Sequence, residues 1–107
     1  MKARSTAHAP PAPETIARKL APYCKASGIV RLEAFGSVAR GDARRGSDVD
    51  LIATFRENPG LRFFGMEEEM AAILGTSVHL LTQDSVQQMT NPYRRASILA
   101  DAKVIYG

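Results

Sequence analysis

The sequence predicts a small mixed α/β fold, in which a sheet of three or four strands carries helices packed on it. One observation is the order of its segments, because helix-like and strand-like stretches alternate along the chain without an internal repeat. A second is length, since 107 residues suit one domain and leave no room for another. The third is composition: 45% hydrophobic and 23% charged residues are ordinary values for a globular protein.

The N-terminal segment, residues 1–12, is rich in alanine and proline and shows no periodicity. We therefore expect a flexible tail, followed by a single domain over residues 13–107. A first helix is predicted to begin at Pro13, because proline suits the first turn of a helix. Pro22 lies inside this helix and is expected to kink or split it, and Gly28 is expected to end it.

The next segments alternate between strand and helix patterns. Apolar and charged side chains alternate over residues 29–35, which predicts a strand that runs into Gly36 and Ser37. A short helix over roughly 37–43 is expected to follow, with Ser37 as its N-cap. The stretch DVDLIATF, residues 48–55, predicts a second strand whose successive side chains point to opposite faces of the sheet.

The C-terminal half predicts the remaining elements. Residues 61–74 form an amphipathic pattern, and its stripe of Met and Phe side chains, which extends to Ile73, is interpreted as core. A third strand is expected over 77–82. A helical segment within 85–101, interrupted at an Asn-Pro pair, and a short final strand over 103–106 complete the fold.

Charge and cysteine content narrow the class of protein. A net charge of +3 and an isoelectric point of about 9.4 permit binding of a triphosphate or a nucleic acid and demonstrate neither. Few aromatic side chains are present to stack bases, which argues against nucleic acid. Cys24 is the single cysteine and cannot form an internal disulfide. Without a secretory signal or a membrane-spanning apolar run, a reducing cytoplasm is expected.

The stretch GSVARGDARRGSDVDL, residues 36–51, carries the strongest chemical signal. Asp48 and Asp50 are two residues apart at the start of a strand, so their carboxylates point to the same side and repel each other. Three arrangements relieve that repulsion. One acid takes up a proton, water solvates both acids at the strand end, or a hard divalent cation such as Mg²⁺ binds both.

The glycine-serine turn that precedes the two acids adds a second signal. Gly36 lets the backbone approach a ligand closely, and the Ser37 hydroxyl and neighbouring amides could donate to a phosphate, although a plain N-cap would look the same. Arg40 is the first candidate for an arginine ligand, ahead of Arg44 and Arg45 in the same loop. Together these groups could bind a triphosphate through backbone amides, an arginine side chain and a metal ion. Nucleotidyl transfer requires all three.

These residues resemble the Gly-Ser and Asp-x-Asp signature of the DNA polymerase β-like nucleotidyltransferases, and more narrowly the minimal nucleotidyltransferases of bacteria and archaea. The likeness covers roughly residues 14–107. It implies a nucleotidyltransferase fold and an NTP substrate such as ATP, with Gly36 and Ser37 holding the phosphates and Asp48 and Asp50 ligating Mg²⁺. Many such proteins pair with a HEPN-type partner as the antitoxin of a toxin–antitoxin module, and some transfer AMP to a tyrosine of the toxin.

One position departs from the family pattern. The family usually carries a third carboxylate on the next strand, in a Val-Asp-Leu context, where this chain has Val78, His79 and Leu80. Neutral imidazole is a poor ligand for Mg²⁺. Three interpretations of His79 stay open. In the first, it replaces the acid in a protein that turns over poorly, and in the second it is itself the catalytic base. In the third, it is a plain sheet histidine, and another acid such as Asp84 or Glu33 acts as the third carboxylate.

Two functions from different classes follow from the sequence. The first is an Mg²⁺-dependent nucleotidyltransferase of the antitoxin type, which transfers NMP to a hydroxyl of a partner protein. The second is a catalytically impaired module that neutralises its partner by contact alone. The histidine at the third position favours the second function, and the complete Gly-Ser and Asp-x-Asp signature favours the first.

Overall fold

The computed structural model describes residues 9–107, so most of the expected tail lies outside the described residues. It confirms the mixed α/β fold with a sheet of four strands. In chain order the elements are α1 (Pro13–Ser27), β1 (Ile29–Phe35), α2 (Gly36–Arg40), β2 (Val49–Phe55), the 3-10 helix η1 (Gly60–Gly65), α3 (Met66–Leu74), β3 (Val78–Thr82), α4 (Gln83–Gln87), α5 (Pro92–Asp101) and β4 (Lys103–Tyr106). None of the helices within residues 9–107 has the length and apolar character needed to cross a membrane.

The four strands form one mixed sheet in the order β3-β2-β1-β4. β1 runs antiparallel to both β2 and β4, and β2 runs parallel to β3. η1 and α3 connect the parallel pair, because parallel neighbours need a long crossover. As a result, the C-terminal end of β1 and the N-terminal ends of β2 and β3 meet at the same end of the sheet.

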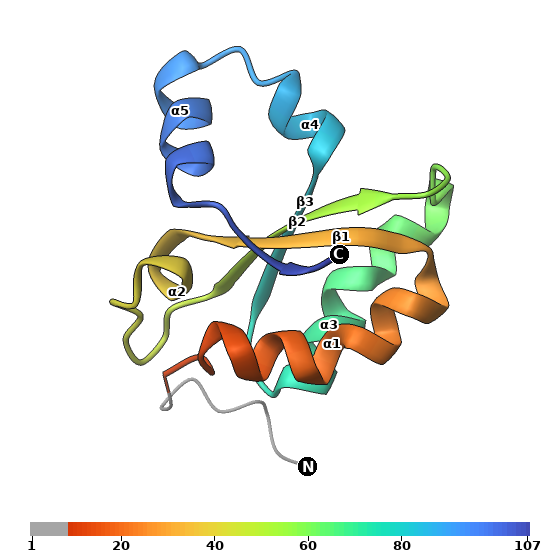
Figure 1. The fold of residues 1–107 in the computed structure, drawn as a ribbon, viewed down its shortest axis with the longest axis horizontal. Helices are drawn as coiled ribbons and strands as arrows, with labels where there is room; N and C mark the ends of the chain where they lie inside the picture. Colours follow the sequence, from red (N-terminus) through yellow and green to blue (C-terminus); the bar gives the residue numbers. More distant parts are fainter. Residues whose placement is uncertain (1–8) are drawn as a thin grey trace.

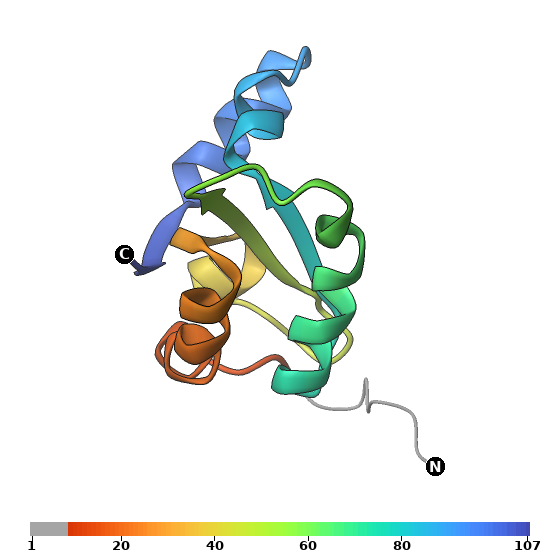
Figure 2. The same ribbon diagram turned by 90° about the vertical axis from the view of Figure 1, so that its right-hand side faces the viewer.

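Helices cover both faces of the sheet, and each face has its own apolar cluster. α1 and α3 lie on one face, and α4 and α5 stand on the other (Figures 1 and 2). The larger cluster lies under α1 and α3 and includes Ile16, Leu20, Leu32, Leu51, Met66 and Met70. The smaller cluster lies under α4 and α5 and consists of Phe35, Ile52, Val86 and Ile98. β2 contributes to both, which confirms the predicted alternation of its side chains.

α1 is a single helix, so of the two effects expected of Pro22 the split is wrong, and the kink stays a prediction. Proline removes one helical hydrogen bond, which leaves the carbonyl group of Arg18 without its usual donor. Both residues lie on the exposed side of α1, where water can replace that donor. Gly28 ends the helix as predicted, with a left-handed φ of 81° and its amide bonded to the carbonyl of Cys24.

The helix after β1 begins earlier and is shorter than the predicted 37–43. α2 spans Gly36–Arg40, its N-cap is Phe35, and no side chain caps it, so the expectation that Ser37 is the N-cap is wrong. The strand passes directly into the helix at Gly36, so Ser37 already lies inside the first turn. Gly41, with φ 86°, ends the helix after five residues, and its amide bonds to the carbonyls of Ser37 and Val38.

The helix predicted over 61–74 is divided into η1 and α3. The α-helical register therefore begins at Met66, and the buried stripe continues at intervals of four residues through Met70 to Leu74. Ile73 is 39% exposed, so its assignment to the core is wrong. The predicted interruption between the last two helices is confirmed by α4 and α5, and the final strand by β4.

Candidate active site

The register of the sheet brings the residues of the motif to one end of three strands. Asp50 of β2 lies opposite Phe35 of β1 and beside His79 of β3. Gly36 follows Phe35 directly, and the exposed Asp48 precedes the first residue of β2. Since directly paired residues point to the same face, Asp50 and His79 share the face on which α4 and α5 stand.

The turn at Gly36 is packed against the carboxylate of Asp50. Gly36 has a φ of 72°, and a Cβ atom built on it would come 2.5 Å from Oδ2 of Asp50. Any other residue would therefore suffer both a strained backbone and a collision with the carboxylate. The glycine predicted for close approach is required here, and the group that it approaches is the second acid of the motif.

The positive groups near Asp50 only partly offset the cost of burying its carboxylate. Its side chain is 24% exposed, and its Oδ1 lies 3.4 Å from Nδ1 of His79, which is longer than an ordinary hydrogen bond. Burial raises the pKa of Asp50, and the negative charge of Asp48 adds to this, whereas His79 and Arg94 lower it. The net direction is upward, because the effect of burial outweighs that of the nearby positive charges.

His79 occupies the place that the match to the family pattern predicted, directly beside Asp50. The other two acids considered for the third position are less suited. Asp84 lies in α4, beyond the C-terminal end of β3, whereas His79 is the second residue of that strand. Glu33 lies opposite Ile52, and its carboxylate is 3.4 Å from the guanidinium of Arg31.

The donor set decides which metal the site can hold. Asp48 and Asp50 offer carboxylate oxygens, and the backbone of Gly36 lies close against the carboxylate of Asp50. Within residues 9–107, no group of three His, Cys, Asp or Glu side chains is arranged to hold a metal ion. Two carboxylates suit Mg²⁺, because this ion usually keeps several waters and takes further oxygens from substrate phosphates. The residues therefore fit one such ion that brings most of its own ligands.

Arg40 connects α2 to α5. Its guanidinium lies 2.7 Å from Asp101 of α5 and 3.2 Å from Asp42 in the following loop. The hydrogen bonds to these two carboxylates raise the pKa of Arg40, which stays charged. Sequence reasoning placed Arg40 in the motif but did not find its partner Asp101, which lies 61 residues away along the chain.

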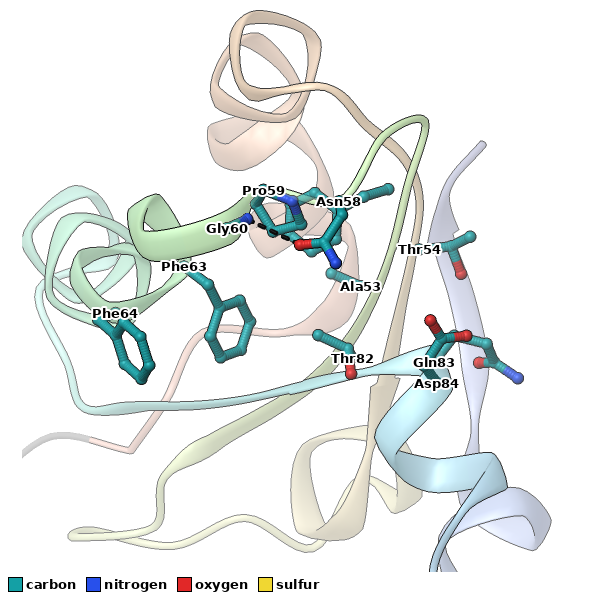
Figure 3. Close-up of a pocket in the computed structure, with 11 residues that line it drawn as sticks. Ala53, Thr54, Asn58, Pro59, Gly60, Phe63, Phe64, Thr82, Gln83 and Asp84 are labelled. Carbon is teal, nitrogen blue, oxygen red and sulfur yellow. Dashed lines mark hydrogen bonds between the residues drawn. The ribbon is translucent and has the colours of Figure 1, made fainter.

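The site at Asp48 and Asp50 is separate from a pocket on the described part of the chain. That pocket has a volume of about 480 Å³ and lies beside the C-terminal ends of β2 and β3 (Figure 3). Its lining includes Phe55, Asn58, Phe63, Phe64, Thr82 and Asp84. Neither this pocket nor the second one, beside Arg56 and Arg62, includes the acids of the motif or His79.

Comparison with known proteins agrees with the motif and the fold. Residues 17–105 match the family model described as a nucleotidyltransferase domain, and the chain therefore belongs to this family. One relative is the protein adenylyltransferase MntA of Thermococcus cleftensis, with 39% identity over 61 residues. The match covers 56% of the chain and 62% of that relative, so the chain spans less than two thirds of its length.

Solved structures share the same architecture. A structure described as a minimal nucleotidyltransferase superposes with a TM-score of 0.65 at 33% identity, over 87% of this chain and 95% of that one. A tri-AMPylated Shewanella oneidensis HEPN toxin in complex with MNT antitoxin provides a further match, with a TM-score of 0.63 at 13% identity. This second match covers 89% of the chain and 72% of its counterpart, and it supports the fold alone.

Proposed function

We propose that this chain is an Mg²⁺-dependent nucleotidyltransferase that transfers AMP from ATP to a hydroxyl group of a partner protein. The observation that carries the proposal is the contact between the Gly36 turn and the carboxylate of Asp50, with Asp48 beside them at the same end of the sheet. A turn that lets phosphates approach and a pair of acids that suits a metal ion are thus adjacent. Nucleotidyl transfer needs both in one place.

Each residue has a distinct task in this reaction. The backbone at Gly36 and the hydroxyl of Ser37 hold the phosphates. Asp48 and Asp50 would hold an Mg²⁺ ion, which would supply positive charge against the phosphate oxygens. The acceptor oxygen forms a bond to the α-phosphorus, the bond from that phosphorus to the bridging oxygen breaks, and pyrophosphate leaves. Arg40 lies beside the turn, but a direct contact with a phosphate would require it to release Asp101.

The acceptor hydroxyl must lose its proton during the transfer. A carboxylate would be the usual base at the third position, and general-base assistance typically contributes about 10²- to 10⁴-fold to the rate. His79 stands at that position, with its Nδ1 facing Asp50 and its side chain 42% exposed. Turnover is therefore expected to be slow if His79 does not accept the proton. If it does, the rate should match that of an enzyme with a working general base.

The proposed partner is a HEPN-type toxin, with this chain as the antitoxin-type component. One relative is named a protein adenylyltransferase, and a structural neighbour is an MNT antitoxin in complex with an AMPylated HEPN toxin. Such a reaction would take place in the cytoplasm, where ATP and magnesium are plentiful.

The decisive experiment incubates the chain with Mg²⁺, α-labelled ATP and the product of the adjacent gene as the candidate partner. Label is expected on the partner, and it should disappear with Asp48→Ala. Glu68→Ala is the matched control, because it removes the same charge from an exposed position on α3, on the opposite face of the sheet. Absence of label in a complex that binds Mg²⁺ and ATP would contradict the transferase proposal.

A second function is favoured by the histidine at the third position. In this alternative the chain is a binding module that neutralises its partner by contact, with little or no transfer. The expected result is then a tight complex without label, whose affinity is unchanged by Asp48→Ala. Pull-down with purified partner, in the presence and absence of ATP, separates the two functions.

A further inference from the structure

One face of α5 is directed toward the sheet and α2. Ile98 on this face is buried against apolar side chains of β1 and β2. Asp101, near the end of the helix, pairs with Arg40 of α2. Arg94 lies four residues before Ile98 and seven before Asp101, and residues at these spacings share one face of a helix. Arg94 therefore extends from the face of α5 that overlies the site.

The position of Arg94 on α5 places its charge above the acids of the motif. Ile98, one turn further along the same face of α5, is buried together with Phe35, and Phe35 is the strand partner of Asp50. Yet Asp50 has its close contact with His79, and among residues 9–107 the guanidinium of Arg94 forms no ion pair. A separation remains between the arginine and the acid, and a negatively charged group could occupy it.

The neighbouring arginines are already engaged. Arg40 contacts two carboxylates, and Nη1 of Arg95 donates to the carbonyl of Met89 at 2.9 Å. The first turn of α5 contains two arginines and no acid. This composition opposes the helix dipole, which favours negative charge at that end. Sequences that break such local rules are expected at functional sites.

We propose that Arg94 binds the polyphosphate of the nucleotide, which would lie between α5 and the acids at the start of β2. This inference rests on the proposed function and adds to it a residue from outside the motif. Arg94 reaches the polyphosphate without breaking an ion pair, whereas Arg40 would have to release Asp101. In this arrangement Arg40 is a positioning residue, because it holds α5 in place through Asp101.

The test measures binding and does not depend on turnover. The probe is ATP with an α,β-methylene bridge, which cannot undergo transfer, titrated calorimetrically with Mg²⁺ present. Arg94→Ala is expected to weaken binding by about 10- to 100-fold, as expected for the loss of a charge-assisted hydrogen bond. Arg94→Lys should give an intermediate loss, because it keeps the charge and loses the planar pair of donors. AMP, which lacks the outer phosphates, should bind the wild type and Arg94→Ala with similar affinity.

Arg18→Ala is the matched control, since it removes the same charge from the exposed side of α1, on the opposite face of the sheet. A thermal melt of each variant verifies folding, and if Arg94→Ala fails to fold, Arg94→Lys and Arg94→Gln decide the question. Equal affinity of wild type and folded Arg94 variants would overturn the role of Arg94 while leaving the proposed function intact. Absence of binding to the wild type, or binding unaffected by Asp48→Ala, would overturn the proposed function together with this inference.

Discussion

Replacing Gly36 by alanine tests the contact on which the proposed site depends. Two effects can be worked out from the structure. A left-handed φ of 72° destabilises alanine by about 1–2 kcal/mol relative to glycine. The new Cβ atom would also lie 2.5 Å from Oδ2 of Asp50, where ordinary contact begins at 3.4 Å, so the two groups must separate by about 0.9 Å. A misplacement of about 1 Å in a catalytic group can reduce the rate by about 10²-fold.

The assay compares Gly36→Ala with Gly41→Ala, which offers the same backbone strain without the collision. Gly41 has a φ of 86°, and an added Cβ atom would meet nothing within 4 Å. Urea denaturation should show a loss of about 1–2 kcal/mol for Gly41→Ala, from the backbone strain alone, and a larger loss for Gly36→Ala, in which the Asp50 side chain must also move. Only Gly36→Ala should also lose Mg²⁺-dependent nucleotide affinity and labelled transfer. Wild-type nucleotide affinity in Gly36→Ala, or an equal loss in Gly41→Ala, would refute the reasoning.

Three further predictions concern the groups around this contact. His79→Asp should raise labelled transfer by about 10²- to 10⁴-fold if the third carboxylate is merely missing, whereas a lower rate and a shifted pH–rate profile would identify His79 as the base. Arg40→Ala and Asp101→Ala should weaken nucleotide binding equally, and the double variant no further, because each removes the ion pair between α2 and α5 that positions α5; additive losses would favour a direct phosphate contact by Arg40. Asp50→Asn should stabilise the nucleotide-free protein near neutral pH, measured by urea denaturation, while abolishing Mg²⁺-dependent nucleotide binding.

The gain in stability expected for Asp50→Asn follows from the burial of the carboxylate. Burial raises the pKa of Asp50, so the folded protein disfavours the charged form, and the free energy of unfolding falls as the pH rises through that pKa. The neutral amide of Asp50→Asn removes this penalty. The advantage of the variant should vanish below the ordinary aspartate pKa of about 3.9, where the acid is neutral in both states. A variant that is no more stable than wild type near neutral pH would contradict this account.

Features encoded over a few residues were predictable from the sequence. The alternating pattern of β2 correctly assigned its two faces, and the predicted third strand is present as β3, where the structure adds that His79 lies beside Asp50. The wrong assignments depended on where one element ends and the next begins, which the intrinsic preferences of single residues do not determine. Ser37 is a preferred N-cap residue, but the strand continues straight into α2 and leaves it inside the first turn.

Contacts between distant segments were not predictable from one sequence. The pair of Arg40 and Asp101 joins residues 61 positions apart, and it depends on how α5 packs back onto the sheet. Arg94 was missed for the same reason, because its distance from Asp50 is determined by the burial of Ile98 and not by any spacing within the motif. The one local signal was the pair of arginines in the first turn of α5, where acids are favoured.

The small apolar cluster beneath α4 and α5 has a consequence for motion. Four buried side chains anchor these helices, whereas the opposite face is held by a much larger core. Regions with few buried apolar contacts open locally before the rest of the protein unfolds. Backbone amides of α5 should therefore exchange their hydrogens with solvent sooner than those of β1 and β2. A nucleotide that spans the gap from the sheet to α5 would slow this exchange, and capture of substrate would then also stiffen the surface that an incoming protein meets.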